Sequence, residues 1–130
     1  MSRLTGLHHT ALTVTDADRG AAWYRALLGL TEVLRGDDDI VSYRVLASDS
    51  IVLGVRQYHG VAAERFDEFR TGLDHLAFGV SSRSELEEWE QLLRERGIPF
   101  TPIAETPIGS VVAFRDPDNI QLEFWLPAAT

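Results

Sequence analysis

Apolar and polar residues alternate along two stretches of the chain that resemble each other. Residues 8–14 read HHTALTV and residues 74–80 read DHLAFGV, with a histidine in the second position of each. Because side chains alternate across a strand, this pattern predicts β-strands over Leu7–Val14 and Leu73–Val80. The larger apolar residues of each strand share one face and should pack on the core. The histidine is therefore expected on the opposite face, among small residues.

The likeness extends to the whole chain, which can be aligned with itself. His9 matches His75 at an offset of 66, and the offset grows to 69 towards the end of the repeat. A small drift in one direction is the result expected of loop insertions. We therefore expect a single domain that spans the chain and contains two copies of one supersecondary unit. The copies cover about residues 5–58 and 72–127, and a linker covers 59–71.

A helix follows the first strand of each copy. Asp16 is a suitable N-cap for the first helix and Gly29 a suitable end, while Ser82 or Ser84 caps the second helix and Gly97 ends it. Apolar residues three and four positions apart give each helix one stripe that should be buried. The stripe contains Ala22, Trp23, Ala26 and Leu27 in the first helix, and Leu86, Trp89, Leu92 and Leu93 in the second.

Three short strands complete each copy. They are predicted over Thr31–Arg35, Ile40–Leu46 and Ser50–Gln57 in the first copy, and over Pro99–Ile103, Ser110–Arg115 and Ile120–Leu126 in the second. Turn-forming residues separate some of these strands, GDDD at 36–39 and DPDN at 116–119. The predicted fold class is therefore α+β, with two βαβββ modules in tandem.

Composition limits the classes of function. The chain has 130 residues, a net charge of −8 and no cysteine. No basic run offsets the negative charge, so nucleic acid is not an expected partner. No apolar run approaches the roughly 18 residues of a membrane span, and the N-terminus lacks a signal-peptide pattern, so we expect no membrane partner and a cytoplasmic location. Without cysteine, any metal must be bound by His, Asp or Glu.

Three residues form a candidate metal site. His9 and His75 occupy equivalent positions of the repeat, and Glu123 shares a strand face with Gln121 and Trp125, opposite three large apolar residues. A carboxylate in an apolar strand is costly unless a positive group meets it. Two histidines and one carboxylate that face a cavity form a triad with coordination positions left for water and substrate. Hydrogen-bonded structural histidines and an exposed position for Glu123 are the alternatives.

Three segments carry a resemblance to a known family. They are HHTALTVTDADRGAAWYRALLGL at 8–30, GLDHLAFGVSS at 72–82 and FRDPDNIQLEFW at 114–125. With these segments the chain resembles the vicinal oxygen chelate (VOC) superfamily, which includes glyoxalase I, extradiol dioxygenases, fosfomycin-resistance enzymes, methylmalonyl-CoA epimerase and bleomycin-binding proteins. The resemblance covers nearly the whole chain. It implies a glyoxalase-like fold, in which the curved mixed sheets of paired βαβββ modules enclose a metal-holding cleft.

The resemblance also implies a set of ligands. Metal ligands of the family come from the first and last strands of each module, and His9, His75 and Glu123 match three of these positions. The fourth position aligns with Gly54, where glyoxalase I has a carboxylate that shares in proton transfer. This difference argues against ordinary glyoxalase chemistry. A His, His, Glu set matches the extradiol dioxygenases and the fosfomycin-type enzymes better.

Strand parity identifies candidates for substrate binding. Arg56 shares the cavity face with Gly54, and its planar guanidinium group suits a substrate carboxylate, phosphate or enolate oxygen. Arg56 is thus a candidate for both substrate binding and catalysis, beside Glu123 as a second catalytic candidate, and a surface ion pair is the alternative for the arginine. Gln121 and Trp125 are candidates to line the opposite wall.

These inferences lead to two functional hypotheses. The first is a metal-dependent isomerase, lyase or dioxygenase that binds a small vicinal-oxygen metabolite at a divalent ion, for which Fe²⁺, Mn²⁺, Ni²⁺, Co²⁺ and Zn²⁺ are all compatible. The second is a small-molecule or antibiotic binding protein of the bleomycin-resistance type, without catalysis. Open sheet edges and the habit of the family predict a homodimer.

Overall fold

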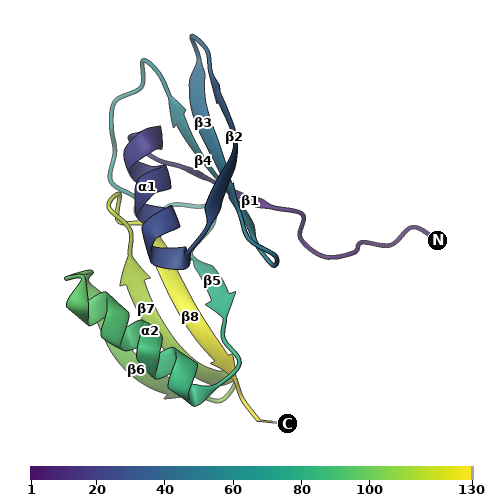
Figure 1. Cartoon of the computed structure of the whole chain (residues 1–130), viewed down its shortest axis with the longest axis vertical. Helices are drawn as coiled ribbons and strands as arrows, with labels where there is room; N and C mark the ends of the chain where they lie inside the picture. Colours follow the sequence, from purple (N-terminus) through teal and green to yellow (C-terminus); the bar gives the residue numbers. More distant parts are fainter. Residues whose placement is uncertain (130) are drawn as a thin grey trace. The chain divides into compact units, whose positions relative to one another are not determined.

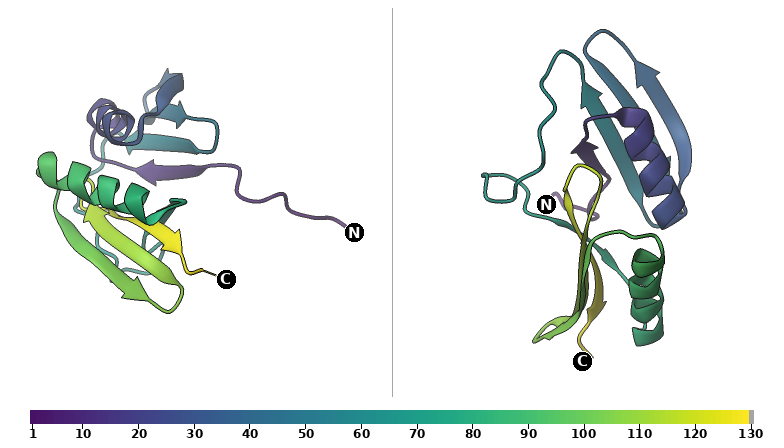
Figure 2. Two further views of the ribbon diagram at one scale, coloured as in Figure 1. Left: turned by 60° about the horizontal axis from the view of Figure 1, so that its bottom comes forward. Right: turned by 90° about the vertical axis from the view of Figure 1, so that its left-hand side faces the viewer.

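The computed structural model describes residues 1–129, which form two compact units. The N-terminal unit is Met1–Glu64, and the C-terminal unit begins at Arg65. In each unit one α-helix covers one face of a four-stranded mixed sheet (Figures 1 and 2). The predicted α+β class with two tandem βαβββ modules is confirmed, and neither sheet closes on itself.

The N-terminal unit has the strand order β1-β4-β3-β2. Strand β1 runs parallel to β4, and the other neighbours are antiparallel. Its elements are β1 (Thr10–Thr13), α1 (Ala17–Leu28), β2 (Thr31–Asp37), β3 (Val41–Ala47) and β4 (Val52–Tyr58).

The C-terminal unit repeats this topology with the order β5-β8-β7-β6, and β5 is parallel to β8. Its elements are β5 (Leu76–Gly79), α2 (Arg83–Glu95), β6 (Phe100–Thr106), β7 (Gly109–Arg115) and β8 (Gln121–Pro127). Among residues 1–129, neither helix is long and apolar enough to cross a membrane.

The ends of the helices follow from local chemistry. The Asp16 carboxylate accepts a hydrogen bond from the backbone N–H of Arg19 at 2.9 Å, and Gly29 ends α1 in the left-handed conformation with φ 67°. The Ser82 hydroxyl accepts from the backbone N–H of Glu85 at 3.2 Å. The predicted caps Asp16 and Gly29 are therefore confirmed, and Ser82 is the cap of α2.

The first strand of each module is shorter than predicted. Pairing of β1 with β4 begins at Thr10, and pairing of β5 with β8 begins at Leu76. These strands lie at a sheet edge and have one partner, so their length is limited by that partner. Leu7 and Leu73, which were predicted to be in the strands, are 94% and 74% exposed. The histidines consequently lie just before the strands.

The buried stripe of α1 also differs from the prediction. Its buried residues are Ala17, Gly20, Ala21, Tyr24 and Leu27. Ala22 and Ala26 are exposed, so only Leu27 was correctly placed among buried residues. Small residues at one end of the stripe let the helix approach the sheet closely, since a Cβ added at Gly20 would lie 3.2 Å from Val14 Cγ2.

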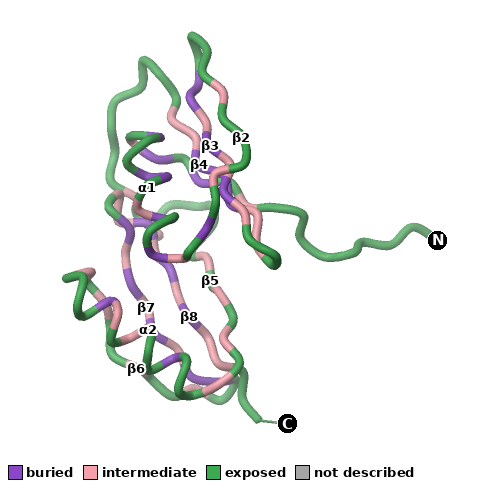
Figure 3. Tube along the Cα trace, in the orientation of Figure 1, coloured by how far each residue is buried: buried purple, intermediate pink, exposed green. Residues whose placement is uncertain are grey.

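The core of each module lies between its helix and its sheet, where buried positions follow the central strands (Figure 3). In the C-terminal unit Leu86 and Leu93 of α2 are fully buried, and Trp89 stacks on Phe124 with ring centroids 4.4 Å apart. Leu122 and Phe124 are buried as well. The alternate residues of β8, Glu123 among them, therefore lie on the face away from this core, as predicted.

Gly109 provides a test of the packing of β7 against β8. Its φ is +144°, and a Cβ added there would collide with the carbonyl oxygen of Leu126. Gly109→Ala should reduce the free energy of unfolding by roughly 2 to 4 kcal/mol, measured by urea denaturation. The control is Gly79→Ala, where an added Cβ meets no atom within 4 Å. The control should change stability by less than about 1 kcal/mol, and equal losses in both variants would contradict this account.

Candidate metal centre

His75 and Glu123 meet in the C-terminal unit. Ala77 of β5 pairs with Glu123 of β8, and His75 precedes Ala77 by two residues on the same face. The Nε2 atom of His75 lies 3.1 Å from Oε1 of Glu123. The Glu123 side chain is 15% exposed and that of His75 is 40% exposed. An imidazole nitrogen and a carboxylate oxygen thus face each other in a partly shielded place.

A second carboxylate contacts the other nitrogen of the same ring. Asp74 Oδ1 lies 2.7 Å from His75 Nδ1. A neutral imidazole carries one N–H and can donate to one of these two carboxylates. The other ring nitrogen then points its lone pair at the second carboxylate, which is unfavourable. A second proton on the ring, or a cation between that nitrogen and the carboxylate, would remove the repulsion. The separation of 3.1 Å between Nε2 and Glu123 Oε1 is that of a direct hydrogen bond, and two atoms that bind one ion at right angles and about 2.1 Å are also about 3 Å apart.

The neighbours on β8 support this pair. Trp125 Nε1 donates to Glu123 Oε1 at 2.7 Å, and Gln121 Nε2 donates to Asp74 Oδ1 at 2.9 Å. Both residues were predicted to bind substrate. In the structure their polar atoms are hydrogen-bonded to the acidic residues on either side of His75.

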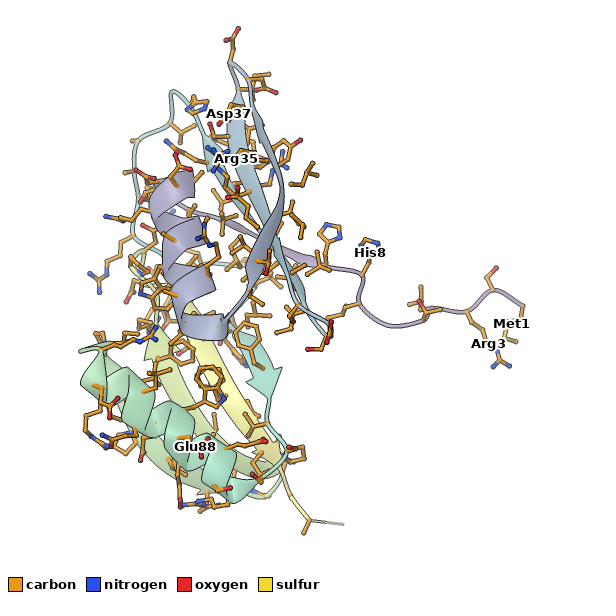
Figure 4. All side chains as sticks on the ribbon, viewed as in Figure 1. Met1, Arg3, His8, Arg35, Asp37 and Glu88 are labelled. Carbon is orange, nitrogen blue, oxygen red and sulfur yellow. The ribbon has the colours of Figure 1, made fainter. Side chains whose placement is uncertain are left out.

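His9, the third predicted ligand, lies in the N-terminal unit. Its Nδ1 atom is 2.8 Å from Nδ1 of His8, which lies where the N-terminal segment leads into β1 (Figure 4). His9 lines a hollow of about 230 Å³ in this unit. The other lining residues are His8, Ala11, Tyr43, Arg44, Val45, Val52, Gly54, Val55 and Arg56.

Two arginines, Arg44 and Arg56, line this hollow, and they differ in their partners. The guanidinium carbon of Arg56 lies 5.4 Å from the ring centroid of Tyr43 and 5.7 Å from that of Tyr58, and its Nε donates to the Tyr58 hydroxyl at 3.2 Å. Within residues 1–129 no carboxylate forms a salt bridge with Arg56. Arg44, by contrast, is buried and pairs with Asp18 at 2.9 Å. Arg56 is therefore available to an anion.

Gly54, which the resemblance aligns with a fourth ligand position, has no side chain to bind a metal ion. Gly54 is buried on β4, and its nearest neighbour is Ala11, whose Cβ would lie 3.6 Å from an added Cβ. Across residues 1–129 no group of three His, Asp or Glu side chains is assembled for metal binding. The structure brings His75 and Glu123 together and places His9 in the other unit, so the complete triad stays a prediction.

Sequence reasoning missed two acidic residues near this site. Asp74 directly precedes His75, and this adjacency was the available signal. Glu68 lies in the predicted linker and accepts two hydrogen bonds from Arg115, at 2.8 and 2.9 Å. These hydrogen bonds lower the pKa of Glu68 from the ordinary 4.5 to about 2. No periodicity marks Glu68, because the contact joins residues 47 positions apart.

The fold and the site define a class of protein. Two tandem βαβββ modules are the fold that this chain shares with glyoxalase-like proteins. The chain belongs to the Glyoxalase/Bleomycin resistance protein/Dioxygenase superfamily, whose family model matches residues 6–124.

Solved structures agree with this assignment. A glyoxylase/bleomycin resistance protein/dioxygenase domain from Frankia sp. EAN1pec is 39% identical, with a TM-score of 0.91, and the alignment covers 97% of this chain and 100% of that one. A glyoxalase-like protein from Bacillus halodurans is 28% identical over 95% and 96% of the two chains, with a TM-score of 0.75.

More distant structures share the fold alone. A mutant of the fosfomycin resistance protein FosX from Listeria monocytogenes, complexed with Mn(II) and a dihydroxypropylphosphonic acid, is 17% identical over 97% and 95% of the chains, with a TM-score of 0.73. No functionally curated protein matches the sequence.

The ion pair of Glu68 with Arg115 makes stability depend on pH. Because the pKa of Glu68 is lower in the folded chain, its contribution is complete above about pH 4.5 and is lost as the pH falls towards about 2. Glu68→Gln should unfold at less urea than the wild type at neutral pH, and the difference should shrink through this acid range. Arg115→Gln should likewise unfold at less urea than the wild type at neutral pH, and this difference should also shrink as the pH falls. A constant difference between wild type and Glu68→Gln over this range would contradict the assignment.

Proposed function

We propose that the protein is a metal-dependent enzyme that binds a small metabolite through two adjacent oxygen atoms. The proposed ligands of the divalent ion are the three residues predicted from the sequence, His9, His75 and Glu123, of which His75 and Glu123 lie in contact within the C-terminal unit. The observation that carries this proposal is the pair of carboxylates around one imidazole, with Asp74 at 2.7 Å from Nδ1 and Glu123 at 3.1 Å from Nε2. A cation between Nε2 and Glu123 satisfies both contacts.

The donor set suits several ions. Two imidazole nitrogens and one carboxylate oxygen are compatible with Fe²⁺, Mn²⁺, Ni²⁺, Co²⁺ and Zn²⁺. Manganese is the first candidate, because a FosX structure of the same fold was complexed with Mn(II). When bound, the ion supplies Lewis acidity towards a substrate oxygen that gains negative charge.

The residues of the chain have separate roles in this proposal. Glu123 is held by the indole N–H of Trp125, which leaves one carboxylate oxygen without this hydrogen bond. Arg56, held against two tyrosine rings, binds a substrate carboxylate, phosphate or enolate oxygen. Gly54 supplies no carboxylate for proton transfer, so an isomerase, lyase or dioxygenase reaction is proposed in place of ordinary glyoxalase chemistry.

Elemental analysis of the protein purified without chelators tests the metal site. The wild type should contain about one divalent ion per chain, and His75→Ala, Glu123→Ala and His9→Ala should lose it. Glu88→Ala, which removes an exposed charge on α2 (Figure 4), should keep it. Iron would favour dioxygenation, and manganese, nickel or zinc would favour isomerisation or transfer.

A folded wild type that binds none of the five ions after reconstitution would reject the enzyme proposal. The hypothesis left would be a small-molecule binding protein of the bleomycin-resistance type.

Arg56 is tested with oxalate, a dianion whose adjacent oxygens can bind a metal ion. Arg56→Gln should weaken oxalate binding to the metal-loaded protein about 10-fold or more in calorimetry, because a charged hydrogen-bond donor is lost. Its metal content should stay unchanged. Arg3→Gln removes the same charge from the exposed N-terminal segment and serves as the control (Figure 4). Equal oxalate affinities of Arg56→Gln and wild type would exclude Arg56 from the site.

A further inference from the structure

The C-terminal unit contains an unbroken series of polar contacts that ends at Nδ1 of His75. Arg115 is held by Glu68 at 2.8 and 2.9 Å and donates from Nη2 to Gln121 Oε1 at 3.2 Å. Gln121 Nε2 donates to Asp74 Oδ1 at 2.9 Å, and Asp74 Oδ1 lies 2.7 Å from His75 Nδ1. The series joins the predicted linker, β7 and β8 to the residue before β5.

The chemistry of each partner fixes the direction of each hydrogen bond. A guanidinium group only donates, so Gln121 accepts from Arg115 with its oxygen and has its amide N–H left for Asp74. An ionised carboxylate only accepts, and each ring nitrogen of His75 faces one. The contact is shorter at Nδ1, 2.7 Å to Asp74 against 3.1 Å from Nε2 to Glu123, so we assign the ring hydrogen of the neutral imidazole to Nδ1. Nε2 is then the basic nitrogen of the neutral ring, and it is the atom that faces Glu123. The series thus selects the tautomer and the orientation of His75.

The internal repeat shows that the fold does not need this series. The positions of Asp74, Arg115 and Gln121 correspond in the first module to His8, Ala47 and Val52. The first module forms the same βαβββ topology with these residues. In that module the nitrogen of His8, and not a carboxylate, meets Nδ1 of His9. The polar series occurs in the second module, where it ends at His75. We therefore relate its role to His75 and not to the fold.

We propose that Asp74, Gln121, Arg115 and Glu68 are positioning residues for His75. They hold the Nδ1–H tautomer and direct Nε2 towards Glu123, so that the pair is ready for a divalent ion. The link to an ion rests on the proposed function, whereas the effect on the tautomer does not. Hydrogen bonds from carboxylates to the outer nitrogen of a ligand histidine orient the ring and strengthen it as a ligand.

Two substitutions of Asp74 separate position from charge. Asp74→Ala and Asp74→Asn remove the same negative charge, but asparagine keeps an acceptor oxygen for Nδ1–H. Long-range ¹H–¹⁵N NMR of the metal-free protein at about pH 8.5, where imidazole is neutral, reports which ring nitrogen is protonated. The wild type and Asp74→Asn should show Nδ1–H for His75. Asp74→Ala should shift His75 towards the Nε2–H tautomer.

Calorimetric titration with Mn²⁺ provides the second measurement. Asp74→Ala should bind Mn²⁺ about 10- to 100-fold more weakly than the wild type, and Asp74→Asn should recover a large part of this loss. Gln121→Leu removes the next contact at nearly the same volume and should also weaken binding. Glu88→Ala, which removes one charge from an exposed position of the same unit, should bind as the wild type does.

The outcomes separate the two proposals. A wild type that binds no Mn²⁺ and none of the other four ions rejects the metal site, while the tautomer measurement still decides the positioning role. Nδ1–H retained in Asp74→Ala overturns the positioning role. Equal losses of Mn²⁺ affinity in Asp74→Ala and Asp74→Asn also overturn it, since the effect would then come from charge alone.

Discussion

The site depends on one constraint, a carboxylate placed on a strand whose other face is the core of a module. Leu122 and Phe124 are buried beneath α2, so the backbone of β8 is fixed and Glu123 must lie on the opposite face. Its carboxylate needs hydrogen-bond donors or a positive charge. The indole N–H of Trp125 satisfies part of this need, and His75 faces the same oxygen. Asp74 contacts the other nitrogen of the His75 ring and accepts a hydrogen bond from Gln121. Gln121 in turn accepts from Arg115, which Glu68 binds, so these residues together fix the position of His75 beside Glu123.

The two modules show that fold and chemistry are specified by different residues. Both modules have the same strand order, one helix and a histidine just before the first strand. These features come from the apolar alternation and the caps, which both copies share. The opposite sheet faces are free to differ, since they carry little of the core. The first module there has a hollow with Arg56, and the second has the polar series around His75.

Features set by local chemistry could be predicted from the sequence. The helix caps Asp16 and Ser82, the order of elements and the core-facing side of β8 each depend on a few neighbouring residues, and the structure has all of them. Features set by tertiary partners could not be predicted. The start of β1 depends on where β4 pairs, and the buried side of α1 depends on how closely Gly20 approaches Val14.

Candidate ligands could likewise be found from the internal repeat and from the alternation of side chains along a strand. The contact of Arg115 with Glu68 could not, because it joins two residues that share no sequence pattern.

The central claim is that His75 and Glu123 bind one divalent ion. Crystals grown with Mn²⁺ and measured at the manganese absorption edge test it most directly. The account predicts an anomalous peak at about 2.2 Å from His75 Nε2 and from a carboxylate oxygen of Glu123. Well-ordered side chains that stay in direct contact, with no peak beside them, would contradict it.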